Sequence, residues 1–140
     1  MAVEGFRDDS GRKAAGAAAS PHIVVVDDSA PMREVLDEVL TSAGYDVLCV
    51  ASGPRALEAM SERLPDLVIT DLLMPGMSGF SLRAAMLRRP DLATIPVVVL
   101  SGYWHRPGET LEAASVIEKP LSVDRLLETV RKLAPFPTSP

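Results

Sequence analysis

Five polar side chains follow apolar runs of the sequence, and their types suit metal and phosphate chemistry. Asp27 and Asp28 come after one run, Asp71 after another, and Ser101 and Lys119 close two more. Carboxylates bind Mg²⁺, a hard cation that keeps several waters and accepts a phosphate oxygen. A hydroxyl and an ammonium nearby could bind further phosphoryl oxygens. Each residue alone has an ordinary explanation, such as a helix cap or a solvated lysine, so the interpretation depends on their meeting in one place.

The apolar runs alternate with longer segments in which apolar residues recur every three or four positions, a pattern typical of strands followed by helices. The expected strands are residues 23–26, 45–50, 67–69, 97–100 and 116–117. Because these strands are apolar on both faces, they belong in a parallel sheet covered by helices on each side. The sequence therefore predicts an α/β fold, a flavodoxin-like doubly wound sheet of five parallel strands in the order 2-1-3-4-5.

This strand order would bring the polar residues together. The first and third strands become neighbours, and ligands of open α/β sheets bind beyond the carboxyl ends of the strands. Asp27, Asp28 and Asp71 would then raise each other's pKa unless a cation lay between them. We therefore expect a Mg²⁺ site, with Ser101 and Lys119 beside it.

The helical segments have clear starts and ends. A serine is placed to cap each of four helices through its hydroxyl, and these residues are Ser29, Ser52, Ser78 and Ser122. The first helix is expected to end at Gly44, the second at Pro65, and the third at Arg89, before Pro90. Between Gly102 and Ala114 the helical pattern is weak, so the fourth helix of the fold is expected to be short or absent.

Length and composition predict one domain. With 140 residues, 47% of them hydrophobic, the chain can bury one core. We expect a disordered N-terminal tail over residues 1–20, a domain over 21–134 and a flexible C-terminal tail over 135–140. The single cysteine, Cys49, is interpreted as a small buried hydrophobe.

The same composition narrows the possible partners. A net charge of −5 argues against nucleic-acid binding, which usually concentrates Lys and Arg. No stretch reaches the roughly 18 apolar residues that a membrane helix needs, so no membrane association and a cytoplasmic location are expected.

Four segments of the chain resemble the receiver domains of two-component response regulators. They are Val25–Ser29, Asp71–Gly79, Leu100–Gly102 and Lys119–Leu121, within a resemblance that extends from about Ile23 to Leu133. Separately these motifs are modest, but their order and spacing are highly specific. The resemblance implies that the chain is a phosphoacceptor of a two-component phosphorelay, which signals by altered partner binding or by phosphate transfer.

The resemblance implies a role for each acidic residue. Asp71 would be the phosphoacceptor, forming an acyl phosphate. Asp28 and Asp71 would bind Mg²⁺ directly with the backbone carbonyl of Leu73, while Asp27 would act mainly through a metal-bound water. Such a domain catalyses only its own phosphorylation and slow autodephosphorylation, and is not otherwise an enzyme.

The resemblance also assigns the remaining polar residues. The positively charged ammonium of Lys119 would contact a phosphoryl oxygen. The Lys119–Pro120 peptide is expected to be cis. The hydroxyl of Ser101 would move inward to the phosphoryl group. Leu73 and Tyr103 would border the path of the hydrolytic water, so we hypothesise a long-lived phosphoryl state.

Two departures from the family pattern affect the expected switch. The position three residues before Lys119 commonly holds Tyr or Phe in the family, but here it is Val116. The segment from Ser101 to Lys119 is shorter than usual by about four residues, or roughly one helical turn. The usual coupling between hydroxyl and aromatic ring is therefore not expected. Partner recognition or dimerisation is expected on a surface other than a standard fourth-helix face.

The implied partners are a histidine kinase or a histidine phosphotransfer protein, with an unknown downstream target, and the chain is expected to be a monomer or weak homodimer. It could be a stand-alone receiver or the receiver module of a hybrid histidine kinase. A small aspartate-nucleophile phosphatase is disfavoured because Asp27 is not followed two residues later by a second Asp. A flavodoxin-like electron carrier would need a phosphate-binding loop where the carboxylates stand. A degenerate receiver is disfavoured because every catalytic position is filled.

Overall fold

Five parallel strands form one sheet with helices on both faces. The computed structural model describes residues 20–102 and 115–137, and the strands in chain order are β1 (His22–Val26), β2 (Asp46–Val50), β3 (Leu67–Asp71), β4 (Val97–Ser101) and β5 (Ser115–Glu118). The helices are α1 (Ala30–Ser42), α2 (Gly53–Glu62), α3 (Gly79–Leu87) and α4 (Val123–Leu133). The strand order is β2-β1-β3-β4-β5, all pairs parallel. The predicted fold class and order are therefore confirmed.

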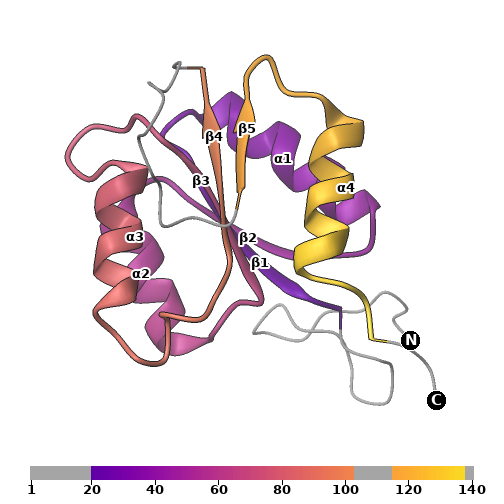
Figure 1. Cartoon of the computed structure of the whole chain (residues 1–140). Helices are drawn as coiled ribbons and strands as arrows, with labels where there is room; N and C mark the ends of the chain where they lie inside the picture. Colours follow the sequence, from indigo (N-terminus) through magenta and orange to yellow (C-terminus); the bar gives the residue numbers. More distant parts are fainter. Residues whose placement is uncertain (1–19, 103–114, 138–140) are drawn as a thin grey trace, which may run out of the picture.

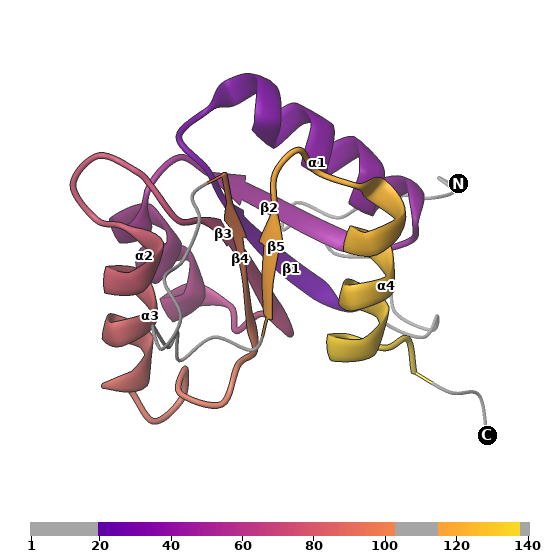
Figure 2. The ribbon, with the colours of Figure 1, turned by 45° about the horizontal axis from the view of Figure 1, so that its top comes forward.

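Two apolar layers hold the helices against the sheet. Helices α1 and α4 cover one face, and α2 and α3 cover the other (Figures 1 and 2). Alternate residues of β1 point to opposite layers, with Ile23 and Val25 packed in the α1 and α4 layer and Val24 and Val26 in the other. Complete burial of such side chains contributes about 1.5–3 kcal/mol each. The central strands are therefore held in place by apolar packing on both faces.

All four predicted helix caps are present. Each serine hydroxyl accepts a hydrogen bond from the backbone N–H three residues later, at 3.2–3.3 Å, and the serines are Ser29, Ser52, Ser78 and Ser122. Gly44 follows the end of α1 with a φ of +103°, a conformation that glycine adopts without a steric penalty. The four helix starts are therefore confirmed.

Some boundaries differ from the prediction. The third helix ends at Leu87 instead of Arg89, because the N–H groups of Arg88 and Arg89 bond three residues back in a tighter turn. The second strand begins at Asp46 instead of residue 45, because the Tyr45 N–H bonds Leu40 O in the turn after α1. The expected short or absent fourth helix, with Tyr103, falls in residues 103–114, outside the described residues.

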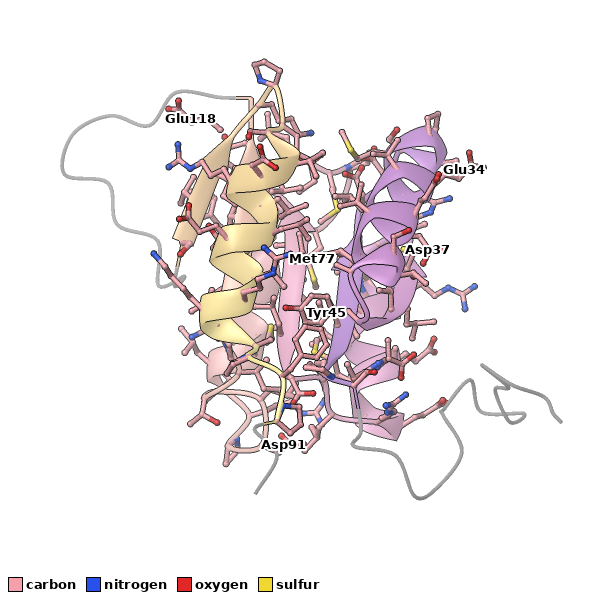
Figure 3. All side chains as sticks on the ribbon, turned by 90° about the vertical axis from the view of Figure 1, so that its right-hand side faces the viewer. Glu34, Asp37, Tyr45, Met77, Asp91 and Glu118 are labelled. Atoms are coloured by element: carbon pink, nitrogen blue, oxygen red, sulfur yellow. The ribbon has the colours of Figure 1, made fainter. Side chains whose placement is uncertain are left out.

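The ends of the chain are described only in part. Nearly all of the expected N-terminal tail, residues 1–19, lies outside the described residues, as do residues 138–140. Within the expected C-terminal tail, Phe136 stacks on Tyr45 with ring centroids 4.7 Å apart, and Figure 3 shows Tyr45 beside the end of α4. This contact joins the segment after α4 to the turn before β2.

Cys49 is half-buried instead of fully buried, because β2 lies at an edge of the sheet. Its side chain still packs against the α1 and α4 layer. Burial raises the pKa of the Cys49 thiol to about 11, with a further contribution from the charge of Asp37. The thiol is therefore protonated at neutral pH, consistent with a packing role.

A charged cluster lies at the amino end of the sheet, away from the predicted site. The buried Asp46 carboxylate accepts from Arg63 Nη1 at 2.8 Å and lies 3.5 Å from His22 Nδ1. Asp66 Oδ2 accepts from the His22 N–H at 2.8 Å. Burial lowers the pKa of His22, and the Arg63 charge lowers it further, while Asp46 and Asp66 oppose the change. The folded protein therefore favours a neutral His22.

This cluster predicts a pH dependence of stability. The pKa of His22 in the folded protein lies below its ordinary value of 6.5. The contribution of neutral His22 to the free energy of unfolding is therefore complete above pH 6.5 and is lost as the pH falls toward the folded pKa. We expect His22→Gln to lose less free energy of unfolding than the unmodified protein between pH 7 and pH 5. Urea denaturation at both pH values measures this, and equal losses in the two proteins would contradict it.

Candidate functional site

Three carboxylates meet at the carboxyl ends of β1 and β3. Asp27 extends β1 by one residue, with its N–H donating to Val50 O at 3.1 Å, and Asp71 is the last residue of β3. Ligand oxygens from Asp27, Asp28 and Asp71 all lie within 4.8 Å of one another. The predicted convergence of these residues is therefore present, because neighbouring parallel strands end at the same edge of the sheet.

Asp27 is the most enclosed of the three. Its residue is 1% exposed, and Oδ1 accepts from the Ser29 N–H at 2.9 Å. Oδ2 is buried and has no hydrogen-bond partner among the described residues. Burial raises the pKa of Asp27, and the charges of Asp71 and Asp28 raise it further against the opposing effects of the Ser29 N–H and Lys119.

This arrangement fits a bound divalent cation. A buried carboxylate oxygen without a partner is costly, and three adjacent negative charges repel one another. A hard cation with oxygen ligands would offset both costs at once. The donor set contains only oxygens, which suits Mg²⁺ or Ca²⁺ better than a thiophilic metal.

Asp71 is held from two sides. Its Oδ1 accepts from the Leu72 N–H at 3.0 Å and from Lys119 Nζ at 3.2 Å. The side chains of Asp71 and Lys119 are 13% and 29% exposed, so their ion pair is partly shielded from water. The lysine predicted to lie across from the carboxylates does so.

Ser101 and Lys119 are brought together by the pairing of β4 and β5. Ser101 is the last residue of β4 and is 2% exposed. The Lys119 N–H donates to Ser101 O at 2.8 Å, directly after β5. The Lys119–Pro120 peptide is cis, as expected. The sheet therefore places the hydroxyl residue and the ammonium residue side by side at the same edge as the carboxylates.

The loop after Asp71 is shaped by close backbone packing. A Cβ on Gly79 would lie 2.8 Å from Asp71 O, and the Gly79 N–H donates to Leu72 O at 2.8 Å. Only glycine permits this approach, which folds the loop back onto the end of β3. The side chain of Leu73, by contrast, is 61% exposed, so it borders the site from the solvent side.

One contact near the site was not expected from the sequence, and one departure already noted in the sequence can now be placed. Arg33, in the second turn of α1, donates from Nη1 to Asp27 O at 2.8 Å, a contact that no motif in the sequence indicates. Val116, the residue that replaces the family's aromatic ring, packs half-buried against the α2 and α3 layer. A small packed side chain there offers no ring that could change its position.

The buried charge of Asp27 is expected to lower the thermal stability of the metal-free protein. Because the pKa of Asp27 is raised in the folded protein, the Asp27 carboxyl contributes most to the stability of the fold when it is protonated. This contribution is lost as the pH rises through the folded pKa. Asp27→Asn keeps an oxygen for the Ser29 N–H and removes the charge, so we expect the metal-free variant to melt a few °C higher at pH 7. Thermal denaturation in EDTA measures this, and a lower melting temperature would contradict it.

Comparison with known proteins points to one family. The family model described as the response regulator receiver domain matches residues 23–131. The two-component response regulator ORR3 of Oryza sativa subsp. indica is 44% identical over 82 residues, which cover 58% of this chain and 63% of that protein. The sensory/regulatory protein RpfC of Xanthomonas campestris pv. campestris is 36% identical over 121 residues, which cover 82% of this chain but 17% of that protein. The chain therefore spans less than two thirds of these relatives.

Solved structures agree with this result. The signal receiver domain of a signal transduction histidine kinase from Syntrophus aciditrophicus superimposes with a TM-score of 0.77 at 33% identity, covering 82% of this chain and 90% of that one. The chemotaxis protein CheY4 of Vibrio cholerae gives a TM-score of 0.76 at 28% identity, covering 82% and 99%. Among the described helices, none is both long and apolar enough to cross a membrane.

Proposed function

Because the chain belongs to the family of response regulator receiver domains, we propose that it accepts a phosphoryl group on the carboxylate of Asp71 with the help of Mg²⁺. The observation that carries this proposal is the meeting of Asp27, Asp28 and Asp71 within 4.8 Å, with Lys119 Nζ 3.2 Å from Asp71. The family is one of signalling modules in two-component systems, and this site supplies the chemistry that such a module needs.

Asp28 and Asp71, with the backbone carbonyl of Leu73, would hold the Mg²⁺ directly, and Asp27 would act mainly through a metal-bound water. The buried Oδ2 of Asp27 supports this assignment, because it has no partner in the part of the chain that the structure describes and needs a proton, a water or a cation. Bound Mg²⁺ supplies charge stabilisation to the phosphoryl oxygens during in-line transfer.

Asp71 would be the nucleophile. Both of its side-chain hydrogen bonds within the described residues fall on Oδ1, so Oδ2 is the oxygen proposed to attack phosphorus. With a phosphohistidine donor, the P–N bond breaks, a P–O bond to Asp71 forms, and the imidazole leaves with the bond's electron pair and takes up a proton. The exposed positions of Asp28 and Leu73 leave the strand ends open to such a donor.

Lys119 and Ser101 would bind the transferred group. The Lys119 ammonium, already within 3.2 Å of Asp71, would move its contact to a phosphoryl oxygen as that oxygen arrives. Ser101, next to it at the end of β4, would offer a hydroxyl donor. These two residues act in the transition state through preorganised positive charge and hydrogen bonding.

The proposed partner is a histidine kinase or a histidine phosphotransfer protein. One comparison favours a second reading, in which the domain is the receiver module of a hybrid histidine kinase. A structural relative at 33% identity is the signal receiver domain of a signal transduction histidine kinase. The site chemistry is the same in both readings. With Val116 in place of an aromatic ring, the phosphorylated state would be read by partners without a ring rotation.

The proposal is tested by intact-mass measurement after incubation with a small acyl phosphate. We expect one added phosphoryl group per chain with Mg²⁺ and none when EDTA replaces the metal. Phosphoryl incorporation that is equal in Mg²⁺ and in EDTA, or no incorporation in either, would contradict the proposed function.

A further inference from the structure

The turn that carries Asp27 is held at its main chain by an arginine from the following helix. Arg33 lies in the second turn of α1, and its Nη1 donates to the backbone carbonyl of Asp27 at 2.8 Å. The contact is partly buried, and the Arg33 residue is itself half-exposed. A hydrogen bond from a charged guanidinium is roughly twice as strong as one between neutral groups.

Asp27 is thereby fixed by three hydrogen bonds from three directions. Its N–H donates to Val50 O of β2 at 3.1 Å, its Oδ1 accepts from the Ser29 N–H at 2.9 Å, and its carbonyl accepts from Arg33. These three hydrogen bonds therefore leave Oδ2 as a buried oxygen of Asp27 without a partner among the described residues.

Arg33 is not needed for the start of α1 through its side chain. The Arg33 N–H donates to Ser29 O at 3.0 Å, and the Arg33 carbonyl accepts from Cys49 Sγ at 3.6 Å. On the Arg33 side, both contacts use only main-chain atoms. A substitution at this position removes the guanidinium contact while those main-chain contacts can remain. The side chain can therefore be tested separately from the helix.

We propose that Arg33 is a positioning residue of the metal site, which holds the Asp27–Asp28 turn in the geometry that binds Mg²⁺. This inference rests on the proposed function, because it assumes that the carboxylates bind Mg²⁺. Arg33 acts through Asp27 and not on the cation. Its positive charge by itself opposes cation binding, so positioning and electrostatics predict opposite effects of its removal.

The test is isothermal titration of Mg²⁺ into the full chain and into Arg33→Met. Methionine keeps the aliphatic stem and removes the donor and the charge. We expect binding about tenfold weaker, the size of loss found when groups that orient metal ligands are removed. Exchange of the Ser29 amide hydrogen, followed by NMR without metal, should become faster in the variant, because the turn is less constrained.

A matched control is Arg83→Met. Arg83 also donates to main-chain carbonyls, from Nη1 to Ile95 at 3.1 Å and from Nη2 to Ala93 at 3.4 Å. Both carbonyls lie in the connection between α3 and β4, which also contains Asp91. Figure 3 shows Asp91 at the opposite end of the molecule from Glu118, which lies at the carboxyl end of β5. This variant should lose stability but bind Mg²⁺ as the unmodified chain does.

The outcomes separate the inference from the proposed function. Weaker binding in Arg33→Met, with normal binding in Arg83→Met and partial recovery in Arg33→Lys, supports the positioning role. Unchanged or tighter binding in Arg33→Met overturns it while leaving the proposed function intact, and equal weakening in both Met variants overturns it as a general effect of stability. Failure of the unmodified chain to bind Mg²⁺ overturns the proposed function and the inference together.

Discussion

An Asp71→Asn variant is expected to take up no phosphoryl group from a small acyl phosphate in the presence of Mg²⁺. The amide oxygen is a poor nucleophile, and the substitution also removes one of the three carboxylates of the cluster. The fold should be retained, because the asparagine oxygen can accept the Leu72 N–H that Asp71 Oδ1 accepts at 3.0 Å. Intact-mass measurement is expected to detect one added phosphoryl in the unmodified chain and none in the variant.

A matched control for this prediction is Asp91→Asn. Asp91 forms an ion pair with Arg89 at 3.1 Å and lies at the opposite end of the molecule from Glu118 (Figure 3). This variant should be phosphorylated at the same rate as the unmodified chain. If Asp71→Asn incorporated phosphoryl at the unmodified rate, another residue would be the acceptor, and the assignment of Asp71 would be wrong.

Lys119→Met is expected to slow phosphoryl incorporation by a factor of about 10²–10³, the usual effect of removing one preorganised donor from developing charge. The ammonium lies 3.2 Å from Asp71 Oδ1 and is 29% exposed, so its charge acts in a partly water-excluded site. Methionine has a similar stem, and the backbone bond from Lys119 N to Ser101 O does not depend on the side chain. Rates at saturating Mg²⁺ measure the effect.

Metal affinity distinguishes loss of catalysis from damage to the site. Removal of a positive charge beside the carboxylates should leave Mg²⁺ binding equal or tighter in Lys119→Met, while phosphorylation becomes slow. Lys132→Met, which changes an exposed residue in the last turn of α4, should alter neither property. An unchanged phosphorylation rate in Lys119→Met would show that the lysine does not contact the transferred group.

The meeting of the three carboxylates could be predicted from the sequence, because it depends on topology. Apolar runs in β1 and β3 indicated two neighbouring strands; Asp27 directly follows β1, and Asp71 is the last residue of β3. Once the strand order is known, the residues after the strands must meet at one edge. The four serine caps were equally accessible, because capping is a local interaction within three residues of the chain.

Other features could not be predicted because they depend on distant contacts. The cluster of His22, Asp46 and Arg63 joins the starts of β1 and β2 to the end of α2, and its members look like ordinary surface residues in the sequence. Arg33 has the same character, since its contact with Asp27 O requires the angle between β1 and α1. Arg83 is a further example, since it donates to two carbonyls across the α3–β4 connection.

The expected lifetime of the phosphoryl state depends on side chains at the edge of the site. Leu73 is 61% exposed and lies two residues after Asp71. The hypothesis that Leu73 and Tyr103 slow hydrolysis concerns in part a residue outside the described ones. It stays a prediction, as do the cytoplasmic location and the domain limits at residues 21 and 134.

The central claim is that Asp28, Asp71 and Lys119 act on one phosphoryl group around one cation. The most direct measurement is a crystal structure grown with Mg²⁺ and beryllium fluoride, a phosphoryl mimic. We expect one Mg²⁺ bound by Asp28, Asp71 and the Leu73 carbonyl, with the mimic on Asp71 and Lys119 Nζ within hydrogen-bond distance of its fluorides. A cation bound elsewhere, or a mimic attached to another carboxylate, would contradict it.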